Sequence, residues 1–145
     1  MDVTWDGVPV APENPRGATI VVWRRAGVSR EFLILHRAAA GPPNFEGDWA
    51  WTPPSGARQP GEDVDQGALR ELREETGLEL LCAQTGLGTE EWPLFVAEAS
   101  GEAAVALDEE HVRSEWVTAA EGAARCLPYV VGVSILAVDR WLDER

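Results

Sequence analysis

Runs of β-branched and aliphatic residues, separated by turn-forming segments, dominate much of this chain. Residues 18–24 and 30–37 are two such runs, and the short segment 25–29 between them contains Gly27, which predicts a β-hairpin. Similar runs predict further strands, at residues 49–52, 80–85, 92–99 and 115–117. We therefore expect most of these segments to pair into a β-sheet.

A helix is predicted in the middle of the chain. Asp63 and Gln66 form a capping-box pattern, and Gly77 supplies the left-handed stop that often follows a helix. Ala68, Leu69 and Leu72 give the segment between them one apolar side. The pattern predicts a helix over residues 64–76.

Two later helices complete the predicted architecture. Thr118 with Glu121 forms a second capping box, which predicts a short helix. A final helix is predicted from Pro128; it is apolar on nearly every side through Leu136, so we expect it to be buried against the sheet. This order of elements predicts an α/β fold with a mixed sheet between helices. We expect one domain over residues 1–145, with an irregular lead-in at 1–16.

Three glutamates lie on one side of the predicted middle helix. At about 100° per residue, Glu71, Glu74 and Glu75 fall within an arc of about 100° near the helix C-terminus. Carboxylates at this spacing repel by about 0.2–0.5 kcal/mol per pair and oppose the helix dipole. A solvated acidic face, neutralised by Arg70 and Arg73, is one interpretation. A bound divalent cation is the other, and the stiff Pro/Gly-rich loop before the helix, within residues 51–62, favours it.

The loop and the helix also fit a longer spacing pattern. Residues 56–78 follow G-x5-E-x7-R-E-U-x-E-E-x-G-U, where U is a bulky aliphatic residue; the fixed positions are Gly56, Glu62, Arg70, Glu71, Leu72, Glu74, Glu75, Gly77 and Leu78. This stretch resembles the Nudix box, the signature of the Nudix hydrolase superfamily. The resemblance implies an α/β/α sandwich with a mixed β-sheet, and hydrolysis of the diphosphate linkage in a nucleoside diphosphate derivative.

The resemblance also implies roles for individual residues. The implied catalytic residues are Glu71, Glu74, Glu75, Arg70 and Glu62, of which the last two would orient the catalytic glutamates. The implied metal ligands are Glu71, Glu74, Glu75, the carbonyl oxygen of Gly56, and a glutamate outside the box. Glu110 fits this last place because it lies six residues before the Trp116-Val117 pair. Glu109 and Glu98 are the alternatives.

Aromatic and arginine residues near the box are candidates for substrate binding. Trp49 and Trp51 lead into the box and Phe45 precedes them, so we expect one of the three to stack on a nucleobase. Arg37, at a strand end, and Arg58, in the box loop, are candidates for phosphate binding. The tryptophans expected in the core are Trp23, Trp92, Trp116 and Trp141. The histidines, expected to be structural or solvated, are His36 and His111.

The cofactor that the resemblance implies is Mg²⁺, with Mn²⁺ as a substitute. Cations held by the glutamates would neutralise the phosphates and lower the pKa of a bound water, and a glutamate would take the proton. Nucleoside triphosphates, dinucleoside polyphosphates and nucleotide sugars such as ADP-ribose stay open as substrates, since Ser55 and Ala57 depart from residues common in known subgroups. A non-catalytic domain that senses a nucleotide is the alternative.

Composition narrows the class of protein further. A formal charge of −13 and a pI near 4.4 argue against binding long nucleic acid. All twelve basic residues are arginine, which excludes a P-loop lysine and a Schiff-base lysine. Cys82 and Cys126 lack partners at metal-binding spacing, so two buried free thiols are expected.

The partners and the location of the protein are also expectations from the sequence. No signal-peptide pattern opens the chain, and the longest apolar run, residues 130–138, is too short to span a bilayer. We therefore expect a cytoplasmic protein with no membrane partner. Its partner would be a small nucleotide, and a homodimer is the one assembly we consider.

Overall fold

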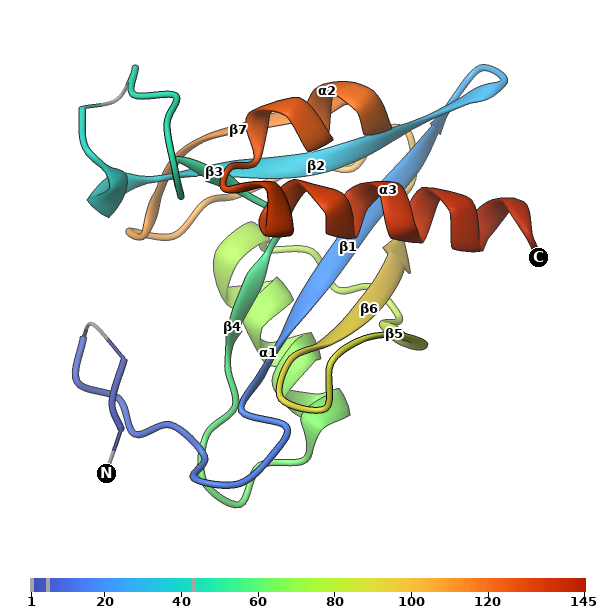
Figure 1. The fold of residues 1–145 in the computed structure, drawn as a ribbon. Coiled ribbons are helices and arrows are strands. Elements are labelled where there is room, and N and C mark those ends of the chain that lie inside the picture. Colours follow the sequence, from blue (N-terminus) through green and yellow to red (C-terminus); the bar gives the residue numbers. More distant parts are fainter. Residues whose placement is uncertain (1, 5, 43) are drawn as a thin grey trace.

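The structure is a computed structural model that describes residues 2–4, 6–42 and 44–145. Its helices and strands follow one another along the chain as shown in Figure 1. They are β1 (Gly17–Ala26), β2 (Ser29–Arg37), the 3₁₀ helix η1 (Ala38–Ala40), β3 (Trp51–Thr52), β4 (Ser55–Ala57), α1 (Val64–Thr76), β5 (Ala83–Gly88), β6 (Pro93–Glu98), β7 (His111–Val117), α2 (Ala119–Arg125) and α3 (Tyr129–Asp143).

The strands form one mixed sheet with β1 at its centre. The order is β3-β2-β1-β6-β5, while β4 pairs with β1 and β7 pairs with β2. β1 and β6 run parallel, and the other pairs are antiparallel. β1 therefore contacts three strands, so the short β4 is attached directly to the middle of the sheet. The predicted mixed sheet and the predicted hairpin of β1 and β2 are confirmed.

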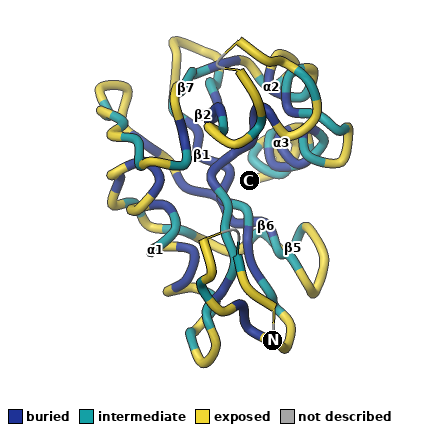
Figure 2. Tube along the Cα trace, turned by 90° about the vertical axis from the view of Figure 1, so that its left-hand side faces the viewer, coloured by how far each residue is buried: buried dark blue, intermediate teal, exposed yellow. Residues whose placement is uncertain are grey.

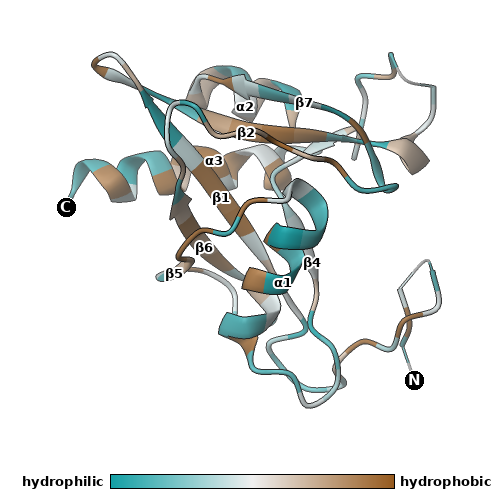
Figure 3. Ribbon diagram, turned by 180° about the vertical axis from the view of Figure 1, so that it is seen from behind, coloured by the Kyte–Doolittle hydropathy of each residue, from teal (hydrophilic) through white to brown (hydrophobic). Residues whose placement is uncertain are grey.

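Helices cover both faces of this sheet. Side chains alternate along β1, so Ile20 and Val22 pack with α1 on one face, and Val21 and Trp23 pack with α3 on the other. Figures 1 and 3 show the two faces, with α2 and α3 over one and α1 over the other. Figure 2 shows that the central strands are buried while the loop ends are exposed. The arrangement is an α/β/α sandwich, as predicted.

α1 begins and ends where its sequence signals predict. The Asp63 side chain accepts hydrogen bonds from the backbone N–H groups of Asp65 and Gln66, and Gly77 adopts a left-handed conformation with φ of 72°. Thr118 and Glu121 form the predicted capping box at the start of α2. Local capping chemistry thus sets the ends of the helix that carries the three glutamates.

Several predicted boundaries differ from the structure. β5 is displaced toward the C-terminus, β7 is longer than expected, and residues 55–57 of the box loop form the unexpected strand β4. α3 is not buried on all sides: Tyr129, Val130 and Leu136 are 71%, 66% and 40% exposed. The reason is that α3 is an outer layer of the sandwich, so only one of its sides faces the sheet, through residues such as Ile135 and Val138.

The tryptophans and cysteines expected in the interior are not equally buried. Trp23 lies in the core, whereas Trp116 and Trp141 are only partly buried against it. Both cysteines are free; Cys126 is buried and Cys82 is half-buried. Among the residues that the structure describes, no helix has the length and apolar character needed to cross a membrane.

Candidate metal and substrate site

β4 holds the loop before α1 against the central strand. In the antiparallel pairing of β4 with β1, Gly56 lies opposite Ala18, and the Ile20 N–H donates to the Pro54 carbonyl at 2.8 Å. α1 packs across both strands. A side chain on Gly56 would overlap the carboxylate of Glu71. The glycine therefore lets the first glutamate of the cluster lie directly on the loop.

Arg70 is the centre of a network of ion pairs at one end of the site. Its guanidinium donates two hydrogen bonds to the Glu62 carboxylate, at 2.7 and 3.0 Å, and one each to Glu71 at 3.0 Å and Glu74 at 3.2 Å. A further bond reaches the Ala57 carbonyl at 3.1 Å. The hydrogen bonds between Arg70 and Glu62 raise the pKa of Arg70 and lower that of Glu62. Both groups stay charged, and the network fixes Glu71 relative to the loop.

Glu75 lies in the floor of the site and is almost fully buried. Its side chain accepts a hydrogen bond from the Ser55 backbone N–H at 3.1 Å, and the residue is 3% exposed. Burial, followed by the charge of Glu71, raises the pKa of Glu75 well above its ordinary value. An ionised carboxylate in this place is costly unless a cation accompanies it.

The pKa of Glu71 is also raised, although Arg70 contacts its carboxylate. Burial raises the pKa of Glu71 to about 7, and the opposing effect of Arg70 offsets this only in part. The charges of Glu74 and Glu110 also raise this pKa. Glu71, which is partly buried, and Glu75, which is buried, thus share an excess of negative charge.

β7 brings a third carboxylate to the same place. Glu110 immediately precedes β7, and with Glu75 and His111 it forms a group whose potential ligand atoms lie within 4.8 Å of one another. His111 is 8% exposed, and its Nδ1 lies 2.9 Å from a carboxylate oxygen of Asp108. A carboxylate that orients a histidine in this way is a common arrangement around metal ions.

These side chains fit a divalent cation. The donor set consists mainly of carboxylate oxygens, which are the ligands that hard cations prefer. Two of these carboxylates, those of Glu71 and Glu75, have raised pKa values, chiefly because burial removes them from water and secondarily because other carboxylates lie nearby. A cation would remove that penalty, so the chemistry of the site favours one.

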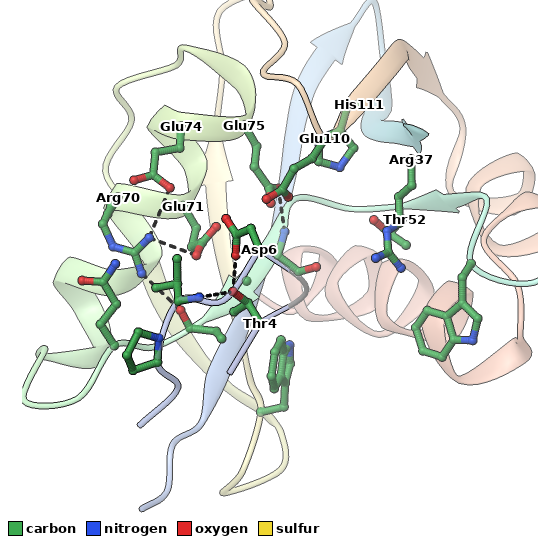
Figure 4. Close-up of a pocket in the computed structure, with 18 residues that line it drawn as sticks. Thr4, Asp6, Arg37, Thr52, Arg70, Glu71, Glu74, Glu75, Glu110 and His111 are labelled. Carbon is green, nitrogen blue, oxygen red and sulfur yellow. Dashed lines mark hydrogen bonds and ion pairs between the residues drawn. The ribbon is translucent and has the colours of Figure 1, made fainter. Parts of the chain in front are cut away.

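The carboxylates line one cavity of about 570 Å³. Figure 4 shows Glu71, Glu75 and Glu110 directed into this space from α1 and from the start of β7, with Arg37 and Thr52 farther along it. A second cavity, of about 660 Å³, adjoins the first, because Trp49, Thr52, Ser55 and Trp92 line both. The lining of the second cavity is mainly apolar and comes from β5, β6 and α3.

The fold and this site agree with a comparison against protein families. The family model described as the NUDIX domain matches residues 13–129. The chain belongs to the Nudix family. The stretch that resembled the Nudix box is therefore the box of a Nudix domain.

Individual relatives of this Nudix domain include two curated enzymes and a solved structure. The bis(5'-nucleosyl)-tetraphosphatase (asymmetrical) of Caenorhabditis elegans is 40% identical over 63 residues, which are 43% of this chain and 41% of that protein. The bis(5'-nucleosyl)-tetraphosphatase (asymmetrical) of Mus musculus is 37% identical over 70 residues, which are 44% of this chain and 43% of that protein. A crystal structure of a C. elegans Ap4A hydrolase binary complex matches with a TM-score of 0.72 and 25% identity, covering 90% of this chain and 100% of that one. The matches to the two curated enzymes span less than half of their length.

The structure places the box residues of this Nudix domain in two groups. Glu71, Glu75 and the main chain of Gly56 lie at the cavity, whereas Glu62 lies behind it, bound to Arg70. Glu74 also lines the cavity, but its side chain is 53% exposed and bonded to Arg70. Glu74 is therefore less enclosed than Glu71 or Glu75.

Two residues outside the box that were expected to bind substrate line the cavity. Arg37, at the end of β2, lines the cavity and is the residue paired with His111 in the sheet. Trp49 is 48% exposed and lines both cavities. A positive charge and an aromatic ring therefore border the cavity.

Two other expectations about substrate binding, those for Trp51 and Arg58, need correction. Trp51 is fully buried, with its indole N–H bound to Glu46 and the guanidinium of Arg125 over its ring at 4.5 Å, so no face is open to a nucleobase. Phe45 is 39% exposed and lies beside Gly41 and Gly47 of its own loop, and its stacking on a nucleobase stays a prediction. Arg58 is 8% exposed and is fully engaged by the chain around it.

The partners of Arg58 explain why it does not reach the cavity. Its guanidinium donates to the carbonyl oxygens of Pro15 at 2.6 Å, Glu62 at 2.7 Å and Glu13 at 3.0 Å. It also pairs with the Glu13 carboxylate at 3.2 Å. Arg58 therefore joins the N-terminal segment to the box loop.

Some residues of the site were missed by reasoning from the sequence. Trp92, expected in the core, lines both cavities; its indole N–H donates to Thr19 at 2.9 Å, and its ring lies against Gly17. Thr4 and Asp6 line the first cavity, although they belong to the irregular N-terminal segment. Nothing in the local sequence around these residues signals their approach to the glutamates.

A substitution at Gly56 tests the close packing of loop and helix. We expect Gly56→Ala to lower kcat about 100-fold, because a methyl group would displace the Glu71 carboxylate and shifts of about 1 Å can have that effect. The comparison is Gly101→Ala, where an added methyl group contacts nothing. Steady-state kinetics of both variants would check this, and equal activity would contradict the packing argument.

Proposed function

We propose that this Nudix domain is a divalent-metal-dependent hydrolase of a phosphoanhydride bond in a nucleoside polyphosphate. The observation that carries the proposal is the convergence of Glu71, Glu75 and Glu110 on one cavity, with the pKa values of the first two raised. Carboxylates this close together are unfavourable without cations. A polyphosphate substrate is also negatively charged, so its hydrolysis requires cations to neutralise the phosphate oxygens.

Glu75, Glu110 and His111 would hold a cation, with Mg²⁺ or Mn²⁺ as the expected ion. When bound, the ion would neutralise the phosphate oxygens and make a water molecule easier to deprotonate. Glu71 is the best-placed base, because Arg70 anchors one of its oxygens and burial raises the pKa of its carboxyl group to about 7. Arg70 and Glu62 hold this base in position and do not themselves take the proton.

The substrate we propose is a dinucleoside polyphosphate such as diadenosine tetraphosphate. The names of the relatives from C. elegans and mouse support this choice. Arg37 would bind phosphate oxygens, and Trp49 and Trp92 would flank a nucleobase that enters the apolar second cavity. The cytoplasmic location, the single-domain organisation and the homodimer stay predictions from the sequence.

A panel of nucleotides tests the function. Purified protein with Mg²⁺ or Mn²⁺ is expected to release nucleotide products from diadenosine tetraphosphate faster than from ATP or ADP-ribose. Chelation of the metal should stop the reaction. No product from any compound would overturn the proposal, and tight binding without cleavage would instead favour a nucleotide sensor.

Trp92 provides a separate test of nucleobase binding. We expect Trp92→Leu to raise KM about tenfold with little change in kcat, since stacking on an aromatic side chain contributes about 1–3 kcal/mol. Trp116→Leu is the matched control, because Trp116 is stacked with Arg24, whose Cζ lies 4.3 Å from the ring centroid, on a different part of the surface. If both variants change KM equally, Trp92 has no specific part in binding.

A further inference from the structure

The N-terminal residues form a small hairpin of their own. This N-terminal hairpin, residues 2–4 and 6–10, has a β-bridge between Val3 and Pro9. The Thr4 N–H donates to the Val8 carbonyl at 2.8 Å, and the Gly7 N–H donates to the Thr4 carbonyl at 2.9 Å. The Thr4 hydroxyl also donates to the carboxylate of Asp6. The carboxylate is therefore held by the turn that carries it.

The N-terminal hairpin is attached to the box loop. The Ala11 N–H donates to the Arg58 carbonyl at 2.7 Å, and the Arg58 N–H donates to the Arg16 carbonyl at 2.8 Å. Val10 and Ala11 are buried, and Asp2 forms an ion pair with Arg16. Together with the buried guanidinium of Arg58, these contacts fix the base of the hairpin beside the loop that precedes α1.

The tip of this hairpin forms one wall of the substrate cavity. Thr4, Asp6, Val8 and Pro9 line the same cavity as the catalytic glutamates. In Figure 4, Asp6 points into the cavity toward the side where Glu71 and Glu75 lie, and Arg37 lies well apart, beyond Thr52. The hairpin and Arg37 thus border different parts of the phosphate site.

The chemistry of this wall disfavours a free phosphate end. Asp6 is exposed and lines the cavity, as do Gln59 and Arg70. The guanidinium of Arg70 already bonds to Glu62, Glu71 and Glu74. A terminal phosphate here would meet a carboxylate, and like charges repel. The hydroxyl groups of a sugar would instead donate hydrogen bonds to Asp6.

We propose that the N-terminal hairpin is a specificity element, in which Asp6 accepts hydrogen bonds from sugar hydroxyls at the far end of the polyphosphate and disfavours a terminal phosphate. The proposal rests on the proposed function. It deepens that function by predicting a preference for substrates that carry a sugar at both ends of the phosphate chain. Dinucleoside polyphosphates and nucleoside diphosphate sugars share this chemistry, and nucleoside triphosphates lack it.

The test compares Asp6→Asn with wild-type protein on diadenosine tetraphosphate, ADP-ribose and ATP. The asparagine keeps the shape of the side chain and removes its charge. We expect the ratio of kcat/KM for diadenosine tetraphosphate to that for ATP to fall about tenfold, because hydrogen bonds to charged groups contribute about 1.5–3 kcal/mol. The change should lie in KM, with kcat nearly constant. The ADP-ribose measurement separates the two kinds of sugar-ended substrate.

Glu102→Gln is the control, since it removes one negative charge at an exposed residue that does not line the cavity. The dissociation constants of non-hydrolysable analogues of diadenosine tetraphosphate and ATP provide a readout that does not depend on turnover. If the wild-type protein cleaves none of the nucleotides, the proposed function is contradicted. An active protein whose substrate and analogue preferences are the same in Asp6→Asn would overturn the role of the hairpin alone.

Discussion

Replacing Glu75 with glutamine should lower kcat by about 10³-fold, which is within the range typical for the loss of a group that acts directly in proton transfer or charge stabilisation. Glu75 is 3% exposed, and the Ser55 N–H fixes one of its oxygens. Glutamine keeps the volume of the side chain but loses the negative charge that would hold a cation together with Glu110 and His111. Initial rates with diadenosine tetraphosphate at saturating Mg²⁺ would measure the effect.

Two further glutamine variants test whether the loss of activity is specific to Glu75. Glu79→Gln changes the charge by the same amount at an exposed residue just beyond α1, so its activity should match the wild type. Glu74→Gln should have an intermediate effect, because Glu74 lines the cavity but is largely exposed. Calorimetric titration with Mn²⁺ should show weaker binding to the Glu75 variant. If that variant keeps a tenth or more of its activity, Glu75 does not have the role proposed for it.

The metal-free protein should become less stable as the pH rises from about 4.5 to about 7. The folded pKa of Glu71 is about 7, above its ordinary value of 4.5, so the folded protein binds this proton more tightly than the unfolded chain does. The contribution is fully present below pH 4.5 and is lost as the pH rises through 7. It amounts to about 3 kcal/mol. Urea unfolding in a chelator, at a series of pH values, would measure it.

At pH 7 and above, added Mg²⁺ should restore the stability that is lost between pH 4.5 and 7, because a bound cation favours the ionised carboxylates. Glu71→Gln should reduce the decline between pH 4.5 and 7 without abolishing it, because the pKa of Glu75 is raised too, while Glu79→Gln should leave the decline unchanged. Below pH 4.5 the free energy of unfolding should instead fall as the pH falls. Hydrogen bonds from Arg70 and Arg125 lower the pKa values of Glu62 and Glu115, and the stabilising contributions of these two carboxylates are lost when they are protonated. A constant free energy of unfolding between pH 4.5 and 7 would contradict the burial argument for Glu71.

Features set by neighbouring residues could be predicted from the sequence. α1 starts at Asp63 and stops at Gly77 because hydrogen bonds within a few residues decide its ends. The same helical spacing that places Glu71 and Glu75 on one side also brings them to one cavity. The position of Glu110 came from the family resemblance, because no local rule relates the start of β7 to a helix so distant in the chain.

Features that depend on distant contacts could not be predicted. Arg58 is a charged residue in a polar loop, and only the approach of Glu13 and Pro15 explains its burial. Trp51 lies as close to the box as Trp49, but Glu46 and Arg125 enclose it. In both cases the side chain has the chemistry to bind a substrate, but its hydrogen-bonding groups or its ring are already occupied within the protein.

The attachment of the N-terminal hairpin to the box loop has a practical consequence for handling the protein. The N-terminal hairpin lies at the substrate cavity, whereas α3 ends well away from the N-terminus, as Figure 1 shows. We expect an affinity tag fused ahead of the N-terminal hairpin to raise KM, because this hairpin borders the cavity and the tag would crowd it. A tag at the C-terminal end leaves that entrance open, and is the arrangement in which kinetic constants should be determined.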